Sequence, residues 1–487
     1  MSPSTAARPT TRASRSVGRA SARRRPDANR ERPLRAAVLT ARPSISPLLP
    51  PIGTGGPRLC DPTGEVSATK RKLSLEVGVI GAGTAGAAAA IALARQGHRV
   101  TLYEAVPEPE PVGAGITVQP TGMGALARLG LLDQVIARGA PIDRLRCLTR
   151  RGRTVLDLRY ADFHPLAFGL GLHRGVLFET LFGAAREEDG VTLRCGVAVE
   201  DLALDGDRRV VVDRAGERHG PHDLVVVADG ARSQLRDDTR LTRRATAYPW
   251  GALWFIGEDA EGEFDRELFQ RVDGTGQMLG LLPSGLGPHG ETPRVSLFWS
   301  VRADQVDRVR DAGLDAWRAE LEALEPRAAP VLAQIGDVSE VLFARYWDVV
   351  LSPWHAERVV YLGDAAHATS PQLGQGANLA LVDALALADA LEGAEDVASG
   401  LARYSRTRRH HLGYYQWATR FLTPFFQSDL RPLGWLRDAF MGLACRLPYV
   451  RTRMLRTMCG LDRGILLADP LPLPEMPRRL QANVRPA

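Results

Sequence analysis

EVGVIGAGTAGAAAAIALARQGHRVTLYE, residues 76–104, is the stretch that decides the fold of this chain. Its first five residues predict a short buried strand. Three glycines, Gly81, Gly83 and Gly86, then follow at G-x-G-x-x-G spacing, directly before an alanine-rich helix. A second predicted strand ends at Glu104. Together these elements predict a β-α-β unit of the kind that binds dinucleotides.

Each part of this pattern has a physical reason. Gly81 allows the chain to turn sharply out of the strand, Gly83 leaves room for backbone N–H groups to approach a pyrophosphate, and Gly86 lets the helix lie close to the sheet. The positive end of the helix dipole favours the anion. Glu104, eighteen residues after Gly86, can accept hydrogen bonds from a ribose diol. The glycines alone are a weak signal, but all these elements in register favour a dinucleotide site over a plain buried β-α-β unit.

The chain has 487 residues, enough for two domains or one large composite, and its net charge of +6 is unevenly distributed. Residues 1–72 hold fifteen Lys or Arg against four Asp or Glu, so residues 73–487 carry a net charge of −5. This mildly acidic body predicts no nucleic-acid surface. Residues 1–72 lack apolar periodicity, which predicts a disordered basic extension. A transit peptide shares this composition, but the many prolines fit its amphipathic helix poorly.

The cysteines and the hydropathy pattern favour a cytoplasmic protein. No uncharged apolar run reaches the roughly eighteen residues that a membrane-spanning helix needs, and we expect no secretory leader. The cysteines are odd in number and lack C-x-x-C spacing, which predicts reduced thiols without a disulfide framework or a metal cluster. They are Cys60, Cys147, Cys195, Cys445 and Cys459.

Two further segments carry candidate ligand-binding residues. Arg174 opens a predicted helix, where its charge opposes the helix dipole, so that a phosphate partner and a plain surface position are both consistent with it. Residues 224–228 form an uninterrupted apolar run, typical of a parallel strand covered on both faces. Asp229 and Gly230 follow this run, at the end of a strand where open α/β sheets bind ligands.

The second strong motif is YLGDAAHATSPQLGQGANLALVDALALADAL, residues 361–391. It predicts a short strand that ends at Gly363 and Asp364, then a glycine-containing loop, then a helix that begins near Asn378. The carboxylate of Asp364 can accept hydrogen bonds from ligand hydroxyls, and the loop offers free N–H groups. The alternative is that Asp364 and Asn378 only form an N-capping network. His367 is more simply a structural histidine than a metal ligand, because no second ligand lies at metal-binding spacing.

The remaining segments predict a frame around these motifs. Residues 121–137 have the apolar spacing of one packed helix, and residues 245–300 alternate as an antiparallel sheet that could wall an apolar pocket. Residues 302–335 predict an amphipathic helical region. From residue 401 the chain is helical, aromatic and rich in arginine. That tail could form a packed cap, pair subunits or touch a membrane surface, and the packed cap is the simplest reading.

Taken together, the three motifs resemble the FAD-dependent aromatic-ring monooxygenase family, which includes para-hydroxybenzoate hydroxylase, salicylate hydroxylase and the ubiquinone-pathway hydroxylases. The resemblance covers about residues 75–400 by order and spacing of elements. Gly-Asp-Ala-Ala-His, followed by Pro and Gly-x-Gly-x-Asn, is the most specific match. Arg174 falls where the family places an FAD-contacting arginine, which favours a functional role for it.

The resemblance implies where FAD would bind. Residues 81–86 would hold the pyrophosphate, Glu104 the adenosine ribose, Asp364 the ribityl chain or pyrophosphate, and residues 374–378 the isoalloxazine edge. The segment at Asp229 would serve FAD and transient NAD(P)H binding. No metal site is implied, and no catalytic residue is assigned. The implied cofactor-binding residues are Gly81, Ala82, Gly83, Thr84, Ala85, Gly86, Glu104, Ala105, Arg174, Val199, Asp229, Gly363, Asp364, Gly374, Gly376, Ala377 and Asn378.

The implied fold is α/β, a Rossmann-like FAD-binding domain with an inserted antiparallel β-sheet substrate domain and a C-terminal helical region. We therefore expect five segments in the chain. They are the disordered basic extension 1–72, the first part of the FAD-binding domain 73–240, the substrate-binding β-sheet domain 241–340, the second part of the FAD-binding domain 341–400 and the C-terminal helical region 401–487.

The implied activity is that of a flavoprotein oxidoreductase. NADPH or NADH would reduce FAD, O₂ would form a flavin C4a-hydroperoxide, and one oxygen atom would hydroxylate an aromatic, quinone-like or other electron-rich small molecule. The alternatives are a membrane-surface hydroxylase of a quinone or prenylated aromatic, an FAD-dependent isoprenoid reductase, and a non-catalytic FAD-binding protein. A related flavin-dependent halogenase needs a lysine, and residues 73–487 contain none. The oligomeric state is not predicted.

Overall fold

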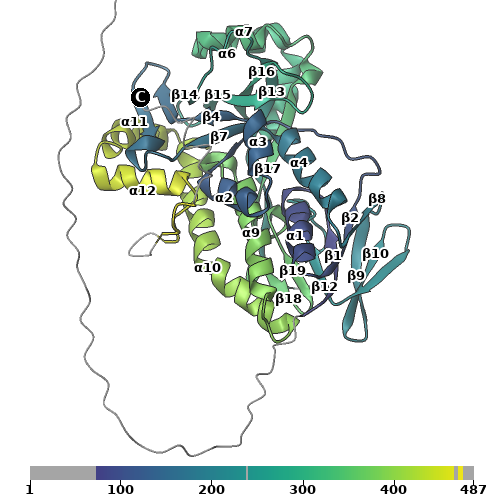
Figure 1. The fold of residues 1–487 in the computed structure, drawn as a ribbon. Coiled ribbons are helices and arrows are strands. Elements are labelled where there is room, and N and C mark those ends of the chain that lie inside the picture. The colour runs from purple at the N-terminus through teal and green to yellow at the C-terminus, as the bar shows by residue number, and fades with distance from the viewer. Residues whose placement is uncertain (1–72, 237–239, 465–469, 475–487) are drawn as a thin grey trace, which may run out of the picture. The chain divides into compact units, whose positions relative to one another are not determined.

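Figure 1 shows the computed structural model, which describes residues 73–236, 240–464 and 470–474. The predictions made for residues 1–72, including the basic extension and the thiol of Cys60, lie outside the described residues. The part of the C-terminal region after residue 474 also lies outside them.

Residues 76–104 form a β-α-β unit within a six-stranded sheet, as predicted. The strands are ordered β18-β19-β12-β1-β2-β8, and all neighbours pair in parallel except β18 and β19. Ile80 of β1 pairs with Val227 on one side and with Tyr103 on the other, so the central strands end together. The bounds are β1 Glu76–Ile80, β2 Arg99–Glu104, β8 Val191–Cys195, β12 Leu224–Val227, β18 His355–Ala356 and β19 Val359–Tyr361.

Three helices pack close to this sheet. Helix α1, Thr84–Arg95, is buried from residue 85 to residue 94, and seven of these ten residues are alanine. Helix α4, Arg174–Glu187, and helix α9, Gly376–Leu391, pack against α1 (Figure 1). The small alanine side chains allow these helices to approach closely, and a helix that is apolar all round belongs in a core. The predicted Rossmann-like unit is therefore confirmed.

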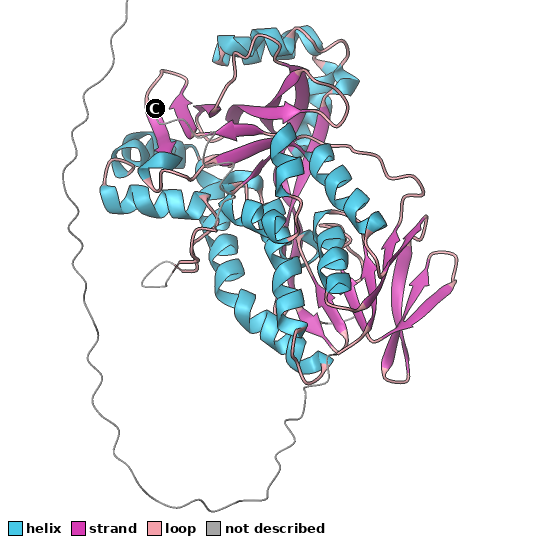
Figure 2. Ribbon diagram, viewed as in Figure 1, coloured by secondary structure: helices cyan, strands magenta, loops and turns pink. Residues whose placement is uncertain are grey.

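A second sheet, of seven strands, contains most of the segment that was predicted to form the substrate-binding domain. Its order is β17-β13-β16-β15-β14-β5-β6, and only β14 and β5 pair in parallel. Figure 2 shows strands of this sheet in magenta beneath the helices at the top of the view. The predicted antiparallel segment 245–300 supplies four strands, and β5, β6 and β17 join from outside the segment 241–340. The bounds are β5 Arg144–Thr149, β6 Thr154–Arg159, β13 Thr242–Glu258, β14 Glu267–Asp273, β15 Gln277–Leu286, β16 Pro293–Arg302 and β17 Leu342–Leu351.

The two faces of the large sheet have different partners, because alternate side chains of a strand point to opposite faces. Leu253, Leu297 and neighbouring side chains pack against the helices that follow β16, and we call this side the outer face. Trp254 and Phe298 lie on the opposite side, with Phe426 from the C-terminal region, and we call this the inner face. The helices on the outer face are α5 Val306–Asp311, α6 Leu314–Leu324 and α7 Ala329–Leu332.

Two three-stranded sheets and two short helices complete this part of the chain. The sheets are ordered β3-β7-β4 and β11-β10-β9. The segment 121–137 was predicted as one helix, and this is wrong: the chain breaks at Gly130, whose φ is +67°. The elements are β3 Gly115–Val118, β4 Ala140–Ile142, β7 Gly169–His173, β9 Val199–Asp205, β10 Arg208–Asp213, β11 Arg218–His222, α2 Pro120–Arg128 and α3 Leu132–Arg138.

The C-terminal region is helical, as predicted. Helix α10 spans Val397–Leu422 and begins at a capping box, in which the side chains of Asp396 and Ser399 each accept a backbone N–H of the other. Helices α11, Arg431–Ala444, and α12, Pro448–Met458, follow it. The short helix α8, Asp364–His367, leads from β19 toward α9. The carboxyl ends of β1, β2, β12 and β19 therefore meet α1, α8 and α9 at one edge of the six-stranded sheet.

Candidate active site

The parallel register brings most of the predicted site residues to that single edge of the sheet. Glu104 is the last residue of β2, Asp229 lies two residues after β12, and Asp364 lies three residues after β19. Asp229 and Asp364 are exposed, and Glu104 is half-buried. Three carboxylates from different strands therefore surround the glycine-rich turn after β1, where open α/β sheets bind their ligands.

In the glycine-rich turn, the chain packs tightly at Gly81 and Gly86 and leaves open space at Gly83. A Cβ on Gly81, whose φ is +93°, would lie 2.6 Å from the carbonyl oxygen of Ala228, and one on Gly86 would lie 1.8 Å from the carbonyl oxygen of Gly81. A Cβ on Gly83 would meet no heavy atom within 4 Å. Gly81 and Gly86 are therefore glycines for packing, whereas Gly83 borders an open space at the start of α1.

Glu104 is held beside this turn by backbone hydrogen bonds. Its Oε2 accepts the N–H of Ala82 at 2.9 Å, and its Oε1 accepts the N–H of Val106 at 3.0 Å. A carboxylate has about four acceptor positions, so Glu104 keeps acceptor capacity for a hydroxyl. Ala105, the next residue, is exposed.

The second motif packs directly against the first. A Cβ on Gly363 would lie 3.0 Å from the Cβ of Ala85 in α1. The Oδ1 of Asp364 lies 3.9 Å from the position of a Cβ on Gly376, at the first residue of α9. The loop before α9 and the turn after β1 thus lie on either side of Asp364. Sequence motifs almost 280 residues apart are assembled into one site.

A buried polar network supports the Gly363 turn. The Oδ2 of Asp383 accepts the Nε2–H of His367 at 2.5 Å and the N–H of Gly363 at 3.1 Å, and its Oδ1 accepts the Nε–H of Arg408 at 2.7 Å. Arg408 also donates to Nδ1 of His411 at 2.5 Å. Burial favours a protonated Asp383 carboxyl, but the interactions with His367 and Arg408 outweigh burial and lower its pKa to about 2.

This network places His367 as a structural residue and adds two residues that the sequence analysis missed. Asp383 and Arg408 are 0% and 3% exposed, and they lie on different helices. The signal for Asp383 was present, because a carboxylate inside the apolar helix ALVDALALADAL must have a partner if it is buried. Its partner Arg408 could not be chosen from the many arginines of α10 without the fold.

Asn378 joins the loop before α9 to the segment before α2. Its Oδ1 accepts the N–H of Gln119 at 2.8 Å, and its amide nitrogen donates to the carbonyls of Thr117 and Gly374 at 3.1 and 3.0 Å. The side chain is completely buried, and both of its N–H groups are used. Asn378 therefore holds the loop in place, and Gly374, Gly376 and Ala377 present the backbone of that loop.

Arg174 lies at the other end of this region. It is the first residue of α4, it is exposed, and its side chain runs beside Gly113, where a Cβ would lie 2.9 Å from the arginine Cδ. Within the described residues its guanidinium has no ion pair. Gly113 and Ala114 also line a cavity of about 210 Å³ together with Trp254 and other residues of β13 and β17.

Val199 is the predicted site residue that the structure does not bring to the glycine-rich turn. It is the first residue of β9 and pairs with Asp213 of β10. Two residues earlier, Val197 donates its N–H to the carbonyl of Glu104 at 2.9 Å. Val199 is therefore connected to the site only through the neighbouring backbone.

The inner face of the large sheet offers an aromatic wall. The rings of Trp254 and Phe298 are 5.0 Å apart, and Tyr346 and Phe426 belong to the same buried cluster. Burial raises the pKa of the Tyr346 phenol and of the Tyr248 phenol above the usual value, so both stay protonated near neutral pH. His289 is 82% exposed at the surface. Trp254 also lines the cavity of about 210 Å³ beside Gly113, whereas Phe298 lies within the core. The structure does not place Tyr248, Tyr346 or His289 as a base.

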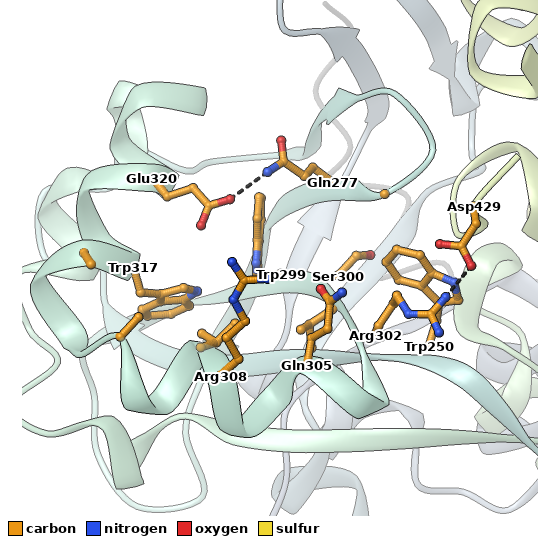
Figure 3. Close-up of a pocket in the computed structure, with 15 residues that line it drawn as sticks. Trp250, Gln277, Trp299, Ser300, Arg302, Gln305, Arg308, Trp317, Glu320 and Asp429 are labelled. Atoms are coloured by element: carbon orange, nitrogen blue, oxygen red, sulfur yellow. Dashed lines mark hydrogen bonds and ion pairs between the residues drawn. The ribbon is translucent and has the colours of Figure 1, made fainter. Parts of the chain in front are cut away.

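A larger cavity lies on the outer face of the same sheet. It has a volume of about 500 Å³ and is lined by Trp250, Trp299, Trp317, Arg302 and Arg308, among others (Figure 3). Arg302 pairs there with Asp429. Trp299 also belongs to the core beneath α5, α6 and α7, on the side of the sheet opposite to Trp254. The sheet itself thus separates this cavity from the aromatic wall.

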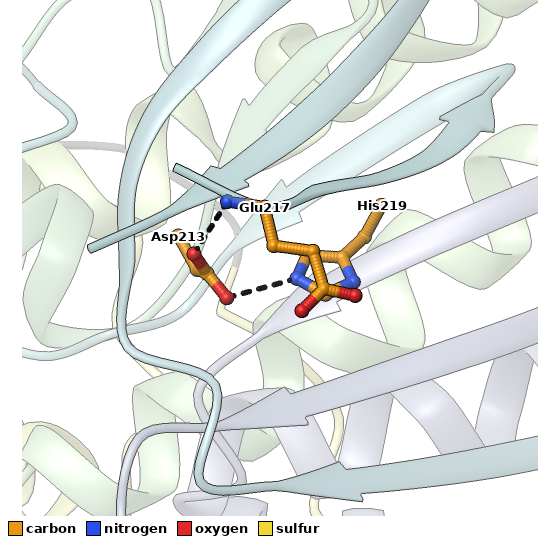
Figure 4. A group of neighbouring side chains, drawn as sticks. All are labelled: Asp213, Glu217 and His219. Carbon is orange, nitrogen blue, oxygen red and sulfur yellow. Dashed lines mark hydrogen bonds and ion pairs between the residues drawn. The ribbon is translucent and has the colours of Figure 1, made fainter. Parts of the chain in front are cut away.

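The described residues also contain one cluster of possible metal ligands, at the turn between β10 and β11. Asp213, Glu217 and His219 have ligand atoms within 4.8 Å of one another (Figure 4). The Asp213 carboxylate accepts the backbone N–H groups of Ala215 and Glu217 and pairs with His219 Nε2 at 3.1 Å. These contacts are those of an ordinary turn closed by an aspartate, and they account for the cluster.

Comparison with known proteins identifies the family. The chain matches a family model described as an FAD binding domain over residues 74–413. A probable 2-heptyl-3-hydroxy-4(1H)-quinolone synthase from Rhodococcus erythropolis is 30% identical over 344 residues, 68% of this chain and 83% of that protein. The aurachin C monooxygenase/isomerase from Stigmatella aurantiaca is 28% identical over 381 residues, 76% of this chain and 94% of that protein.

The fold is shared with solved structures. Klebsiella pneumoniae HpxO, solved with FAD and uric acid, superposes with a TM-score of 0.65 at 24% identity, over 79% of this chain and 97% of that one. Pseudomonas aeruginosa PqsL, solved with 2-aminobenzoylacetate, gives a TM-score of 0.65 at 24% identity, over 75% of this chain and 100% of that one. The chain therefore belongs to the FAD-dependent aromatic-ring monooxygenases, and it is a flavoprotein oxidoreductase.

Proposed function

We propose that FAD binds along the carboxyl edge of the six-stranded sheet, at the residues predicted from the sequence. The backbone N–H groups of residues 81–86 and the start of α1 would hold the pyrophosphate, and Glu104 would hold the adenosine ribose. Asp364 would contact the ribityl chain or the pyrophosphate, and the backbone at residues 374–377 would border the isoalloxazine ring. Asn378 would act by fixing that loop.

The open space at Gly83 is the observation that carries this assignment. The turn around it is packed to contact at Gly81 and Gly86, yet no atom lies within 4 Å of a Cβ on Gly83. The exposed guanidinium of Arg174 and the exposed carboxylates of Asp229 and Asp364 supply the charged and acceptor groups that a dinucleotide needs. These residues fit FAD. We also propose the domain boundaries predicted from the sequence, at residues 240, 340 and 400.

The reaction that we propose is NAD(P)H- and O₂-dependent hydroxylation of a small aromatic or quinone-like compound. FAD, when bound, supplies hydride acceptance from NAD(P)H and activation of O₂. Trp254, which lines the cavity beside Gly113 and Ala114 and packs on the core around Phe298, would orient a flat ring and exclude water. Relatives whose names contain a quinolone, a phenazine and kynurenine favour a substrate with an aromatic ring.

The proposed function is tested with purified, FAD-loaded protein and a panel of phenols, quinolones, quinols and prenylated aromatics. The flavin absorbance is followed after anaerobic addition of NADPH or NADH, then after O₂. The expected result is that one compound speeds flavin reduction and leaves as a product heavier by one oxygen atom. Flavin that reduces and reoxidises with no hydroxylated product from any compound contradicts the proposal.

A second candidate is a hydroxylase that works at a membrane surface on a quinone or a prenylated aromatic. It is favoured by apolar side chains that α10 and α11 expose, among them Trp417, Trp435 and Phe440. Among the described residues, no helix is both long and apolar enough to cross a bilayer. We propose a cytoplasmic location, since the four cysteines that the structure describes are free thiols. Contact with the membrane would then be peripheral.

A further inference from the structure

The exposed apolar surface of the described residues is concentrated in the C-terminal helices. Thirteen large apolar side chains are exposed, and nine of them lie within residues 417–449. Scattered exposed apolar residues are ordinary, whereas a concentration of this kind marks an interaction surface. These nine are Trp417, Phe421, Leu430, Trp435, Leu436, Phe440, Leu443, Leu447 and Tyr449.

Helix α11 is inverted relative to an ordinary surface helix. Its buried side chain is that of Arg437, which is 1% exposed, whereas Trp435 is 73% exposed and Phe440 is 61% exposed. Arg437 donates to the carbonyl of Phe425 at 2.8 Å and to Oδ1 of Asp438 at 2.7 Å, and its guanidinium lies over the ring of Phe426. The arginine thus fixes which side of α11 faces inward.

The exposed side of α11 forms a continuous apolar stripe. Leu436, Phe440 and Leu443 follow one another at spacings of four and three residues, which places them on one face of the helix. Trp435 adjoins this stripe, and we call these four side chains the α11 face. At the end of α10 the rings of Trp417 and Phe421 stack 5.4 Å apart, and Phe421 contacts Phe425. Through Phe425 this second patch is linked to Arg437 of α11.

The C-terminal helices are also strongly basic. Residues 397–464 contain twelve Arg and three Asp, a net charge of +9, whereas residues 73–396 carry a net charge of −15. Arg431 opens α11 and Arg446 follows its end. Both are exposed, and neither forms an ion pair with a described residue. Free cations therefore flank the α11 face at both ends.

We propose that the α11 face docks on the surface of an anionic lipid bilayer. Apolar and aromatic side chains would enter the headgroup boundary, and the flanking arginines would contact lipid phosphates. A second copy of this chain is the less favourable occupant, because a symmetric dimer through this face would bring Arg431 and Arg446 at its ends close to the same cations of the other copy. The docking itself does not depend on the proposed function. Only its biological purpose does, which would be access to an aromatic substrate dissolved in the membrane.

The α11 face lies beyond the residues that the family model matches. The family model ends at residue 413, before the first of the nine exposed side chains. Docking would therefore use a part of the chain beyond the matched FAD-binding segment, and residues 73–396, which hold most of that segment, carry the opposite net charge.

The test is co-sedimentation of the full, FAD-loaded chain with phosphatidylcholine vesicles and with vesicles that also contain phosphatidylglycerol. We expect binding to the anionic vesicles, and we expect the Phe440→Ser, Leu443→Ser double variant to lose roughly tenfold or more in partitioning. Leu204→Ser is the matched control, because Leu204 is 57% exposed on β9, outside the C-terminal helices. Residues 1–72 carry a net charge of +11 and could also attract anionic vesicles. A salt-dependent binding signal therefore does not identify the α11 face, and the comparison between the variants does.

Three outcomes overturn the docking proposal. They are no binding to anionic vesicles, equal binding by the double variant, and an equal loss in the control variant. A dimer in light scattering that the double variant abolishes, without vesicle binding, assigns the face to self-association instead. Flavin content and hydroxylation are measured separately in vesicle-free buffer. Vesicle binding without hydroxylation would then contradict the proposed function and leave the docking intact.

Discussion

The carboxyl edge of the six-stranded sheet and the α11 face depart from ordinary burial in opposite ways. At the sheet edge, a scaffold that is buried on all sides presents polar groups and the open space at Gly83. In α11, Arg437 is buried and Phe440 is exposed. Folded chains break the rules of burial mainly where they bind something. The two regions thus indicate two kinds of partner, a dinucleotide and a bilayer.

The two regions also differ in what holds them. The sheet edge depends on a connected frame, in which Asp383 joins the Gly363 turn to Arg408 of α10. The α11 face consists of exposed side chains that do not pack in the core. Substitutions at the edge should therefore cost stability or cofactor affinity, and substitutions on the α11 face should cost docking alone.

The largest expected effect is on stability, from Asp383→Ala. The substitution leaves Arg408 buried without its partner and removes the acceptor of the Gly363 N–H, so we expect a loss of about 3–5 kcal/mol in the free energy of unfolding. The measurement is urea unfolding of the full chain. Asp389→Ala is the matched control on the same helix, because the Asp389 and Arg128 side chains are 49% and 56% exposed, and it should change stability by less than about 1 kcal/mol. Equal effects of the two substitutions would show that the network does not hold the edge.

The next effect is on cofactor binding, from Gly83→Glu. A carboxylate in the space reserved for the pyrophosphate opposes a like charge, and we expect FAD affinity to fall roughly a hundredfold or more. Gly413→Glu is the matched control, because Gly413 is an exposed residue of α10 and an added Cβ there would meet no atom within 4 Å. The flavin-to-protein absorbance ratio after gel filtration measures both. Stoichiometric FAD in purified Gly83→Glu protein would refute the assignment of the turn.

A smaller effect is expected on the pH dependence of stability. Burial and the neighbouring Arg408 lower the pKa of His411 to about 3, well below its unfolded value. As pH falls, the histidine of the unfolded state takes up its proton first, which stabilises the unfolded state. The free energy of unfolding therefore falls below about pH 6.5, and at pH 5 it is lower by about 2 kcal/mol on account of His411. Urea unfolding at pH 7 and pH 5 should show a pH-dependent loss that is smaller by about this amount in His411→Gln. An unchanged difference between the two pH values would contradict the buried neutral histidine.

The smallest effect is expected from Leu443→Ser in α11. Leu443 is 60% exposed, so the free energy of unfolding should change by less than about 0.5 kcal/mol. Thermal unfolding without vesicles provides the measurement. A destabilisation of several kcal/mol would show that the α11 face packs against another part of the chain, and the contrast between the two regions would then fail.

The flavin edge was predictable from the sequence because its signals are local. Gly81, Gly83 and Gly86 lie within six residues of one another and directly follow the strand that they serve. The parallel register then brings the ends of three other strands to the same place without further information. The roles given to the individual site residues remain a proposal, with Val199 the least connected of them.

The parts that sequence reasoning missed depend on contacts between distant segments. Nothing within β5 or β17 shows that each extends the sheet formed mostly by residues 242–302. Likewise, the sequence of α11 has apolar residues on more than one side. The contact of Arg437 with the carbonyl of Phe425 decides which side turns inward, and that contact exists only in the folded chain.

The most direct test of the central claim is the mass of the product formed under isotopically labelled O₂, with NADPH or NADH and the best substrate from the panel. A monooxygenase inserts one atom of O₂, so the product should carry one labelled oxygen and the other labelled atom should leave as water. An oxygenated product without label, or a reduced product formed equally well without O₂, would contradict the monooxygenase and favour hydration or double-bond reduction.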